Sequence, residues 1–141
     1  QALGDQRSRA VTLGDIARIK VSKGEVDEAL KLHQERLPVY QALGDVNGKA
    51  HTLWSIAQIE MRKEDYPNAF LHLQASYDIL LKLSRLDGII YVGLDLGQLL
   101  YAAGAKEEGM AILSRSRDGF RKLGQEALAR QVQALLDSLS S

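Results

Sequence analysis

The sequence repeats itself with a fixed period of about 40 residues, and this regularity limits the chain to a small group of architectures. The segment Gln1–Asp5 recurs as Gln41–Asp45, and the small residue Ala29 corresponds to Ala69 and then to Gly109. No insertion or deletion interrupts this spacing along the 141 residues. A repeat of this length is typical of an array in which each unit buries its apolar face against its neighbours. The sequence therefore predicts a stacked repeat array.

Each repeat contains two segments that have the pattern of an amphipathic helix. Their apolar residues recur at steps of three and four residues, which is the spacing of one helix face. Asp5 and Asp45 follow a glycine and precede such segments, so we expect each to be a helix N-cap. Gly24 and Gly44 are expected to end helices, and Pro38 is expected to kink a helix without ending it. The seven expected helices span residues 5–22, 26–43, 45–62, 66–83, 86–103, 106–123 and 125–139.

Large and small residues also occupy fixed places in each repeat. The first helices carry the motifs Leu13-x-x-Ile16-Ala17, Leu53-x-x-Ile56-Ala57 and Gly93-x-x-Leu96-Gly97, and the second helices carry the small residues Ala29, Ala69 and Gly109. This pattern resembles the tetratricopeptide repeat (TPR) family, in the branch with a 40-residue period that includes the kinesin light chains. HEAT-type repeats have a similar length but lack these small residues. The resemblance implies an all-α fold, a right-handed superhelical array of antiparallel helix pairs. We expect a single array with repeats at 1–40, 41–80 and 81–120 and a C-terminal capping helix at 121–141.

The resemblance further implies that the first helix of each repeat lines a concave groove for a partner. Trp54 lies one residue beyond the family's core tryptophan position, which Leu53 fills, so we expect Trp54 to point into the groove. The alternative is that Trp54 or Tyr101 belongs to the core, because the last helix could fold over such side chains. Aromatic and methionine side chains beside amides suit a peptide groove. The expected partner-binding residues, which should form one continuous surface, are Arg18, His51, Trp54, Gln58, Met61, Tyr91, Leu94, Gln98 and Tyr101.

Composition argues against several other classes of function. The 18 basic residues balance 18 acidic residues, so we expect no nucleic-acid and no membrane partner. Cysteine is absent, and His33, His51 and His72 lie on different predicted helices, so we expect no metal, no cofactor and no catalytic site. Gly14 and Ser55 replace the residues with which some family members grip a terminal carboxylate. An apolar or helical segment is therefore the favoured ligand.

Basic and acidic residues alternate along the first repeat in a way that is typical of solvated helix faces. The basic residues of this pattern are Lys20, Lys23, Lys31 and Arg36. We therefore expect Arg36 to be exposed.

These features predict a protein–protein interaction scaffold that binds a peptide or a partner segment in its groove. The alternative is a sensor or regulatory segment of a larger signalling protein, such as a signal-transducing ATPase, whereas no residues support an enzyme. The chain opens in the middle of a repeat and shows neither an initiator methionine nor a signal peptide. We therefore expect a fragment of a longer, cytoplasmic protein, whose exposed N-terminal end offers a face for self-association.

Overall fold

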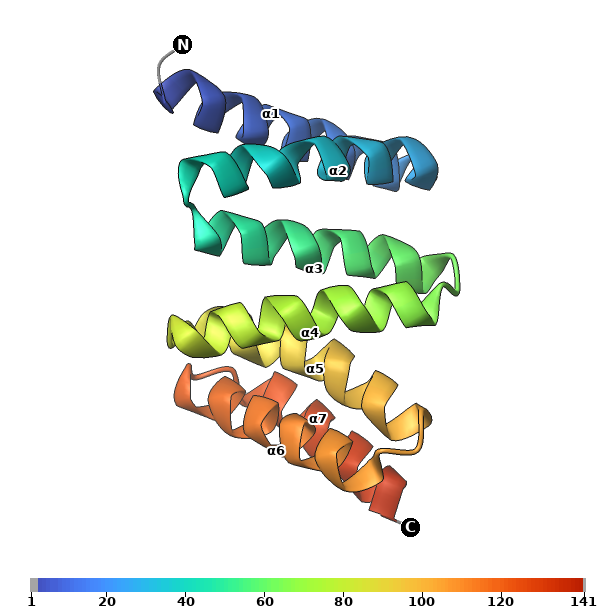
Figure 1. Ribbon diagram of the computed structural model, residues 1–141. Coiled ribbons are helices and arrows are strands. Elements are labelled where there is room, and N and C mark those ends of the chain that lie inside the picture. The colour runs from blue at the N-terminus through green and yellow to red at the C-terminus, as the bar shows by residue number, and fades with distance from the viewer. Residues whose placement is uncertain (1–2, 141) are drawn as a thin grey trace. The chain divides into compact units, whose positions relative to one another are not determined.

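The chain consists of helices joined by short turns (Figure 1). The computed structural model describes residues 3–140, and side chains from residue 4 onward. Within residues 3–140 there are seven α-helices and no strand, which confirms the all-α prediction, and the bounds lie within two residues of the expected ones. The helices are α1 (Leu3–Ser22), α2 (Val26–Leu43), α3 (Val46–Arg62), α4 (Tyr66–Lys82), α5 (Leu86–Ala102), α6 (Lys106–Lys122) and α7 (Glu126–Ser140).

The chain divides into two compact units, and the boundary between them falls inside α4. Unit 1 ends at Ser76 and unit 2 begins at Tyr77. In unit 1, α2 packs against both α1 and α3, and in unit 2, α6 packs against both α5 and α7. Consecutive helices within each unit run antiparallel (Figure 1). That residues 1–141 form one continuous array stays a prediction.

Every turn between consecutive helices contains a residue with a positive φ angle. The glycines 24, 44, 104 and 124 fill four of these positions, and Glu64 and Ser84 fill the other two with φ angles of 60° and 54°. The positions recur at a constant spacing of half a repeat, so successive helices end in the same way. Glycine adopts this left-handed conformation without steric penalty, and the turn lets the Gly44 N–H donate to the Gln41 carbonyl oxygen at 3.2 Å. The predicted ends of α1 at Gly24 and of α2 at Gly44 are therefore confirmed.

The two predicted N-caps have different outcomes. Asp45 caps α3 as predicted, because its Oδ1 accepts a hydrogen bond from the Gly48 N–H at 2.9 Å. The prediction for Asp5 is wrong, because α1 already begins at Leu3 and contains Asp5 in its first turn. An N-cap needs a non-helical backbone, which the preceding turn supplies at Asp45, whereas Gly4 is itself helical. The Asp5 carboxylate instead lies near the positive end of the α1 dipole.

Pro38 lies inside α2, which continues through it to Leu43. The prediction that Pro38 does not end the helix is confirmed. Because proline has no N–H, the backbone bond from residue 38 to the Gln34 carbonyl oxygen is missing. The expected kink at this point stays a prediction.

Small residues at the recurring repeat positions 29, 69 and 109 allow helices to cross at close range. In unit 2, a Cβ atom added to Gly109 of α6 would lie 2.7 Å from the carbonyl oxygen of Gly97 and 2.8 Å from the backbone nitrogen of Tyr101, both in α5. Ala29 and Ala69, which share this repeat position, are 0% exposed. A larger side chain at position 109 would therefore force α5 and α6 apart.

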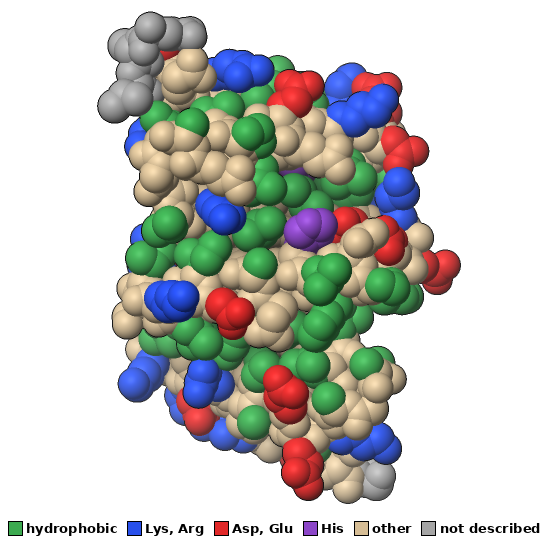
Figure 2. Space-filling view, in the orientation of Figure 1, with side chains coloured by type: hydrophobic (Ala, Val, Ile, Leu, Met, Phe, Trp, Pro, Cys, Tyr) green, Lys and Arg blue, Asp and Glu red, His purple; other side chains and the backbone are tan. Residues whose placement is uncertain are grey.

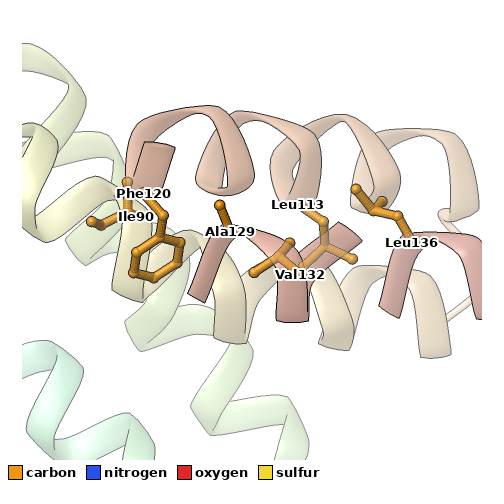
Figure 3. Close-up of a cluster of buried hydrophobic side chains, with 6 residues drawn as sticks. All are labelled: Ile90, Leu113, Phe120, Ala129, Val132 and Leu136. Atoms are coloured by element: carbon orange, nitrogen blue, oxygen red, sulfur yellow. The ribbon is translucent and has the colours of Figure 1, made fainter. Parts of the chain in front are cut away.

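The C-terminal helix α7 completes the core of unit 2. Its buried residues lie at steps of three and four, which is the spacing of one helix face. Figure 3 shows them among side chains from α5 and α6. The cluster consists of Ile90, Leu113, Phe120, Ala129, Val132 and Leu136.

One face of α1 is exposed although its counterparts in later repeats are buried. Ile16 is 39% exposed, whereas Ile56 and Leu96 are 2% and 0% exposed. Thr12 is likewise exposed, whereas Thr52 is fully buried. Apolar side chains thus reach the surface among polar and charged ones, as they do elsewhere on the face in Figure 2. Self-association through this end of the molecule stays a prediction.

Candidate binding surface

Three helices of unit 1 line an open cavity of about 370 Å³. Helix α1 supplies one wall, α2 contributes a single histidine, and α3 supplies the rest. The lining residues are Arg18, Val21, Ser22, His33, His51, Trp54, Ser55, Gln58, Ile59 and Arg62. The lining that the structure describes contains two guanidinium groups and two imidazoles but no carboxylate. The cavity is therefore basic, although the whole chain carries no net charge.

Trp54 is a half-buried residue of α3 in the wall of this cavity. Its neighbour Leu53 is 5% exposed and belongs to the core, and successive side chains on a helix diverge by about 100°. The indole therefore lies at the edge of the core rather than within it. The ring of His51 lies edge-on to it, with the two ring centroids 6.0 Å apart.

The other residues predicted from unit 1 lie on or near the same cavity. Arg18, His51 and Gln58 are exposed and line it. Met61 is half-buried and is not part of the lining. The structure thus brings together four of the five residues expected from this unit. Their role in partner binding stays a prediction.

Arg36 of α2 is buried at 7% exposure, so the prediction that it lies on a solvated face is wrong. Its guanidinium donates to the Ala10 carbonyl oxygen at 2.9 Å, to His33 Nδ1 at 3.1 Å and to the Tyr40 hydroxyl at 3.4 Å. A Cβ atom added to Gly14 would lie 2.5 Å from the guanidinium carbon. The absence of a side chain at position 14 therefore leaves the space that the guanidinium fills.

The next repeat contains a signal that could have revealed this burial. Ser76, the counterpart of Arg36 in the second repeat, is buried and donates to the Ala50 carbonyl oxygen at 2.8 Å. Ala50 is the counterpart of Ala10, so Ser76 and Arg36 make equivalent bonds from the same repeat position. A small residue at position 76 indicates a buried site, and Gly14 indicates the room for a larger occupant. The prediction of an exposed Arg36 relied on the alternating charges of the first repeat and did not consider Ser76 or Gly14.

His33 lines the cavity and contacts Arg36 at the same time. A guanidinium can only donate hydrogen bonds, so Nδ1 of His33 is the acceptor and the neutral ring carries its hydrogen on Nε2. Burial, followed by the positive charge of Arg36 and the nearby His51 and Arg18, lowers the pKa of His33 to about 4. Near neutral pH, His33 is therefore an uncharged hydrogen-bond donor in the cavity wall.

The remaining charged groups lie at the exposed edge of the cavity. Arg18 pairs with Asp15 of the same helix, and both side chains are well exposed. Arg62 is exposed and forms no ion pair within the described residues. Partial loss of solvent around the His51 ring, followed by the charges of Arg36 and Arg18, lowers the pKa of His51, although the residue as a whole is exposed. Loss of solvation and the guanidinium charges together thus lower the pKa values of both cavity histidines.

His72 lies outside this cavity, and its Nδ1 is 2.7 Å from Oε1 of Glu60. Sequence spacing did not reveal this pair, because the two residues come from α3 and α4. Among the side chains that the structure describes, no three metal-ligating groups come together.

In unit 2, α7 covers much of the face that was expected to bind a partner. Tyr91 and Leu94 are half-buried against the cluster of Figure 3, and the Tyr101 hydroxyl donates to the Leu139 carbonyl oxygen at 2.8 Å. Gln98 is exposed, and its amide nitrogen donates to the Leu94 carbonyl oxygen at 2.9 Å. Tyr91, Leu94 and Tyr101 thus contact the C-terminal part of unit 2, whereas Gln98 stays exposed, and the role of all four in partner binding stays a prediction. That they form one surface with Trp54 stays a prediction.

Comparison with known proteins identifies the fold. No protein-family model matches the sequence, and no curated protein matches it. Among solved structures, a kinesin light chain-like protein of Podosopora anserina with nearly identical TPR-like repeats superposes with a TM-score of 0.66 at 14% identity, over 94% of this chain and 75% of that one. A variant of that protein with one substitution gives a TM-score of 0.67 at 15% identity, over 94% and 74%. The resemblance that the repeat pattern predicts is thus confirmed at the level of the fold, and this chain has the fold of the TPR-like helical repeat proteins.

Proposed function

We propose that this chain is a protein-binding scaffold that holds a segment of a partner in the cavity of unit 1. The observation that carries the proposal is the position of Trp54, a half-buried aromatic in the wall of an open cavity. Partly exposed aromatic residues of this kind dominate the binding free energy of many interfaces. The TPR-like fold supports a scaffold as well, since helical repeats present extended binding surfaces.

The chemistry of the lining favours a peptide segment as the occupant. Val21, Ile59 and the indole of Trp54 offer apolar contacts, while Ser55 and Gln58 offer hydroxyl and amide groups. An extended or helical segment presents both apolar side chains and backbone polar groups, so it matches this mixture. We propose binding rather than catalysis, in the cytoplasm and without a nucleic-acid partner. None of the helices in residues 3–140 combines the length and apolar composition needed to cross a bilayer.

The test selects ligands from a random peptide library on the immobilised chain and measures the affinity of the selected peptides. Trp54 is the only tryptophan, so its fluorescence reports occupancy of the cavity directly. We expect Trp54→Ala to weaken binding about 30-fold or more, since a buried aromatic anchor contributes about 2 kcal/mol or more. Titration calorimetry measures this loss, because the variant lacks the fluorophore.

Tyr66→Ala is the matched control, because Tyr66 is 47% exposed and lies outside the cavity. Its affinity should equal that of the wild type. Circular dichroism of Trp54→Ala should remain that of the folded chain. Unfolding of Trp54→Ala would show that the indole is a core residue, and equal losses in the two variants would remove the cavity from the binding site.

A further inference from the structure

We propose that the cavity of unit 1 binds an anionic group of the partner segment, a side-chain carboxylate or a phosphate, through His33 and the guanidinium groups of Arg18 and Arg62. This inference rests on the proposed function, because it names the chemistry of the segment that the cavity accepts. It differs from the capture of a terminal carboxylate, for which Gly14 and Ser55 lack the required groups, because it also uses His33 of the second helix α2.

The first support is the composition of the lining. Arg18 and Arg62 stand on different helices at the exposed edge, and no described lining residue is a carboxylate. The partner of Arg18 is Asp15, an exposed residue outside the lining, so this ion pair is open to exchange with a ligand. Guanidinium groups bind carboxylate and phosphate oxygens through paired hydrogen bonds.

The second support is the buried charge of Arg36. Its hydrogen-bond partners are all neutral, namely a carbonyl oxygen, an imidazole nitrogen and a phenol, and within the described residues it forms no ion pair. A buried cation without a counter-charge is costly and favours an anion close by. The cavity beside His33 is the adjacent space that an anion can enter.

The third support is the hydrogen-bond polarity of His33. Arg36 occupies Nδ1 as a donor, so the other ring nitrogen carries the hydrogen and acts as a donor itself. An anion that accepts this hydrogen bond is stabilised by the guanidinium behind the ring, because hydrogen bonds in a chain polarise one another. Arg36 is thus a positioning residue, which fixes the tautomer of His33 and supplies charge without lining the cavity.

This arrangement is confined to the first repeat. The counterparts of Arg36 are Ser76 and Ser116, and the residue that corresponds to Gly14 in the second repeat is Trp54. A glycine inside a helix lowers the stability of that helix. The first repeat has Gly14 and Arg36 where the second repeat has Trp54 and Ser76, and this difference costs stability that packing alone does not require. Anion binding in the cavity gives the pair a function.

The experiment is an NMR titration of the whole chain at pH 7 and constant ionic strength, with inorganic phosphate in one arm and acetate in the other, each replacing chloride. We expect the NMR chemical shifts of the His33 and His51 rings and of the Trp54 indole to change in a saturable way in at least one arm. Saturation by acetate assigns a carboxylate, and saturation by phosphate alone assigns a phosphate. A long-range proton–nitrogen spectrum should show the His33 hydrogen on Nε2.

Single variants then locate the anion. Arg18→Gln and Arg62→Gln, both at exposed positions, should each lower the affinity for the probe by up to about fivefold, which corresponds to the loss of one exposed ion pair. Arg36→Met should also weaken binding of the probe, and the hydrogen of the His33 ring should no longer be confined to Nε2. If Arg36→Met fails to fold, the results for Arg18→Gln and Arg62→Gln test the proposal by themselves. Lys31→Gln removes an exposed cation of α2 outside the cavity and should change nothing.

Two outcomes would overturn the inference: the absence of saturable shifts in both arms, or binding that Arg18→Gln and Arg62→Gln leave unchanged. Either result, together with selected peptides that depend on Trp54, would leave the proposed function intact. Conversely, if both probes bind at the cavity while no peptide does, the anion site stands and the scaffold proposal fails.

Discussion

Acidification from pH 8 to pH 5 should destabilise unit 1 through His33. Burial and the Arg36 charge lower the pKa of His33 to about 4, whereas an unfolded histidine has a pKa of about 6.5. The unfolded chain therefore binds a proton more readily than the folded chain. The contribution of His33 to stability is complete well above pH 6.5, falls as the pH drops, and is fully lost only below about pH 4.

The magnitude follows from the two pKa values. At pH 5 the unfolded histidine is protonated and the folded one is mostly neutral, so the loss corresponds to about 1.5 pH units. At about 1.36 kcal/mol per unit, the loss amounts to at most about 2 kcal/mol. Urea unfolding followed by circular dichroism at the two pH values measures it as a shift in the free energy of unfolding.

The control is His33→Gln, which keeps an acceptor for Arg36 and does not titrate. Between pH 8 and pH 5, the free energy of unfolding of His33→Gln should fall by less than that of the wild type, with a difference of up to about 2 kcal/mol. Titration of His51, whose pKa is also lowered, affects both proteins and cancels in the difference. Equal losses in the two proteins would refute the argument, because His33 would then have the same proton affinity in the folded and unfolded chains.

Two further predictions concern packing in the repeats. Gly109→Ala should destabilise the chain by up to about 2 kcal/mol, because overpacking against the α5 backbone costs about 1–3 kcal/mol and the gain in helix propensity returns about 1 kcal/mol. Gly4→Ala, a helical site with nothing within 4 Å of the added Cβ, should not destabilise, and thermal unfolding of both variants is the test. Ser116→Ala should be neutral or stabilising by up to about 1 kcal/mol, because the buried Ser116 hydroxyl has no hydrogen-bond partner among the described residues. Ser76→Ala should cost about 1 kcal/mol, because it removes the bond to the helix α3 backbone; equal effects at the two serines in urea unfolding would contradict both assignments.

The helices and their ends were predictable because local chemistry determines them. A positive φ angle at a constant spacing ends each helix that another follows, and glycine marks four of the six positions in the sequence. Glu64 and Ser84 adopt the same conformation without glycine, and only the repeat spacing indicates them. The close approach of two helices at Gly109 can be inferred for a similar reason, since a small residue recurs at one place in every repeat.

The candidate site was only partly predictable, because it depends on contacts between distant residues. The position of Trp54 beside the core rather than within it could be inferred from its neighbour Leu53, which is a local comparison. Arg36 was misjudged, because its burial depends on Gly14, which lies in the preceding helix. Charge alternation along one helix indicates solvent exposure only while the facing helix carries ordinary side chains.

The repeat itself explains where such errors arise. At positions 36, 76 and 116 the three repeats place a guanidinium, a bonded hydroxyl and an unbonded hydroxyl in buried surroundings, so the fold requires only that this site be filled. A residue that agrees with its counterparts in the other repeats reports on the architecture they share. A residue that differs from its counterparts, and that is accompanied by a second difference in the residue it packs against, indicates a function specific to that repeat. Arg36 with Gly14 is such a pair, and it stands directly behind the histidine of the cavity in which we place the partner's anionic group.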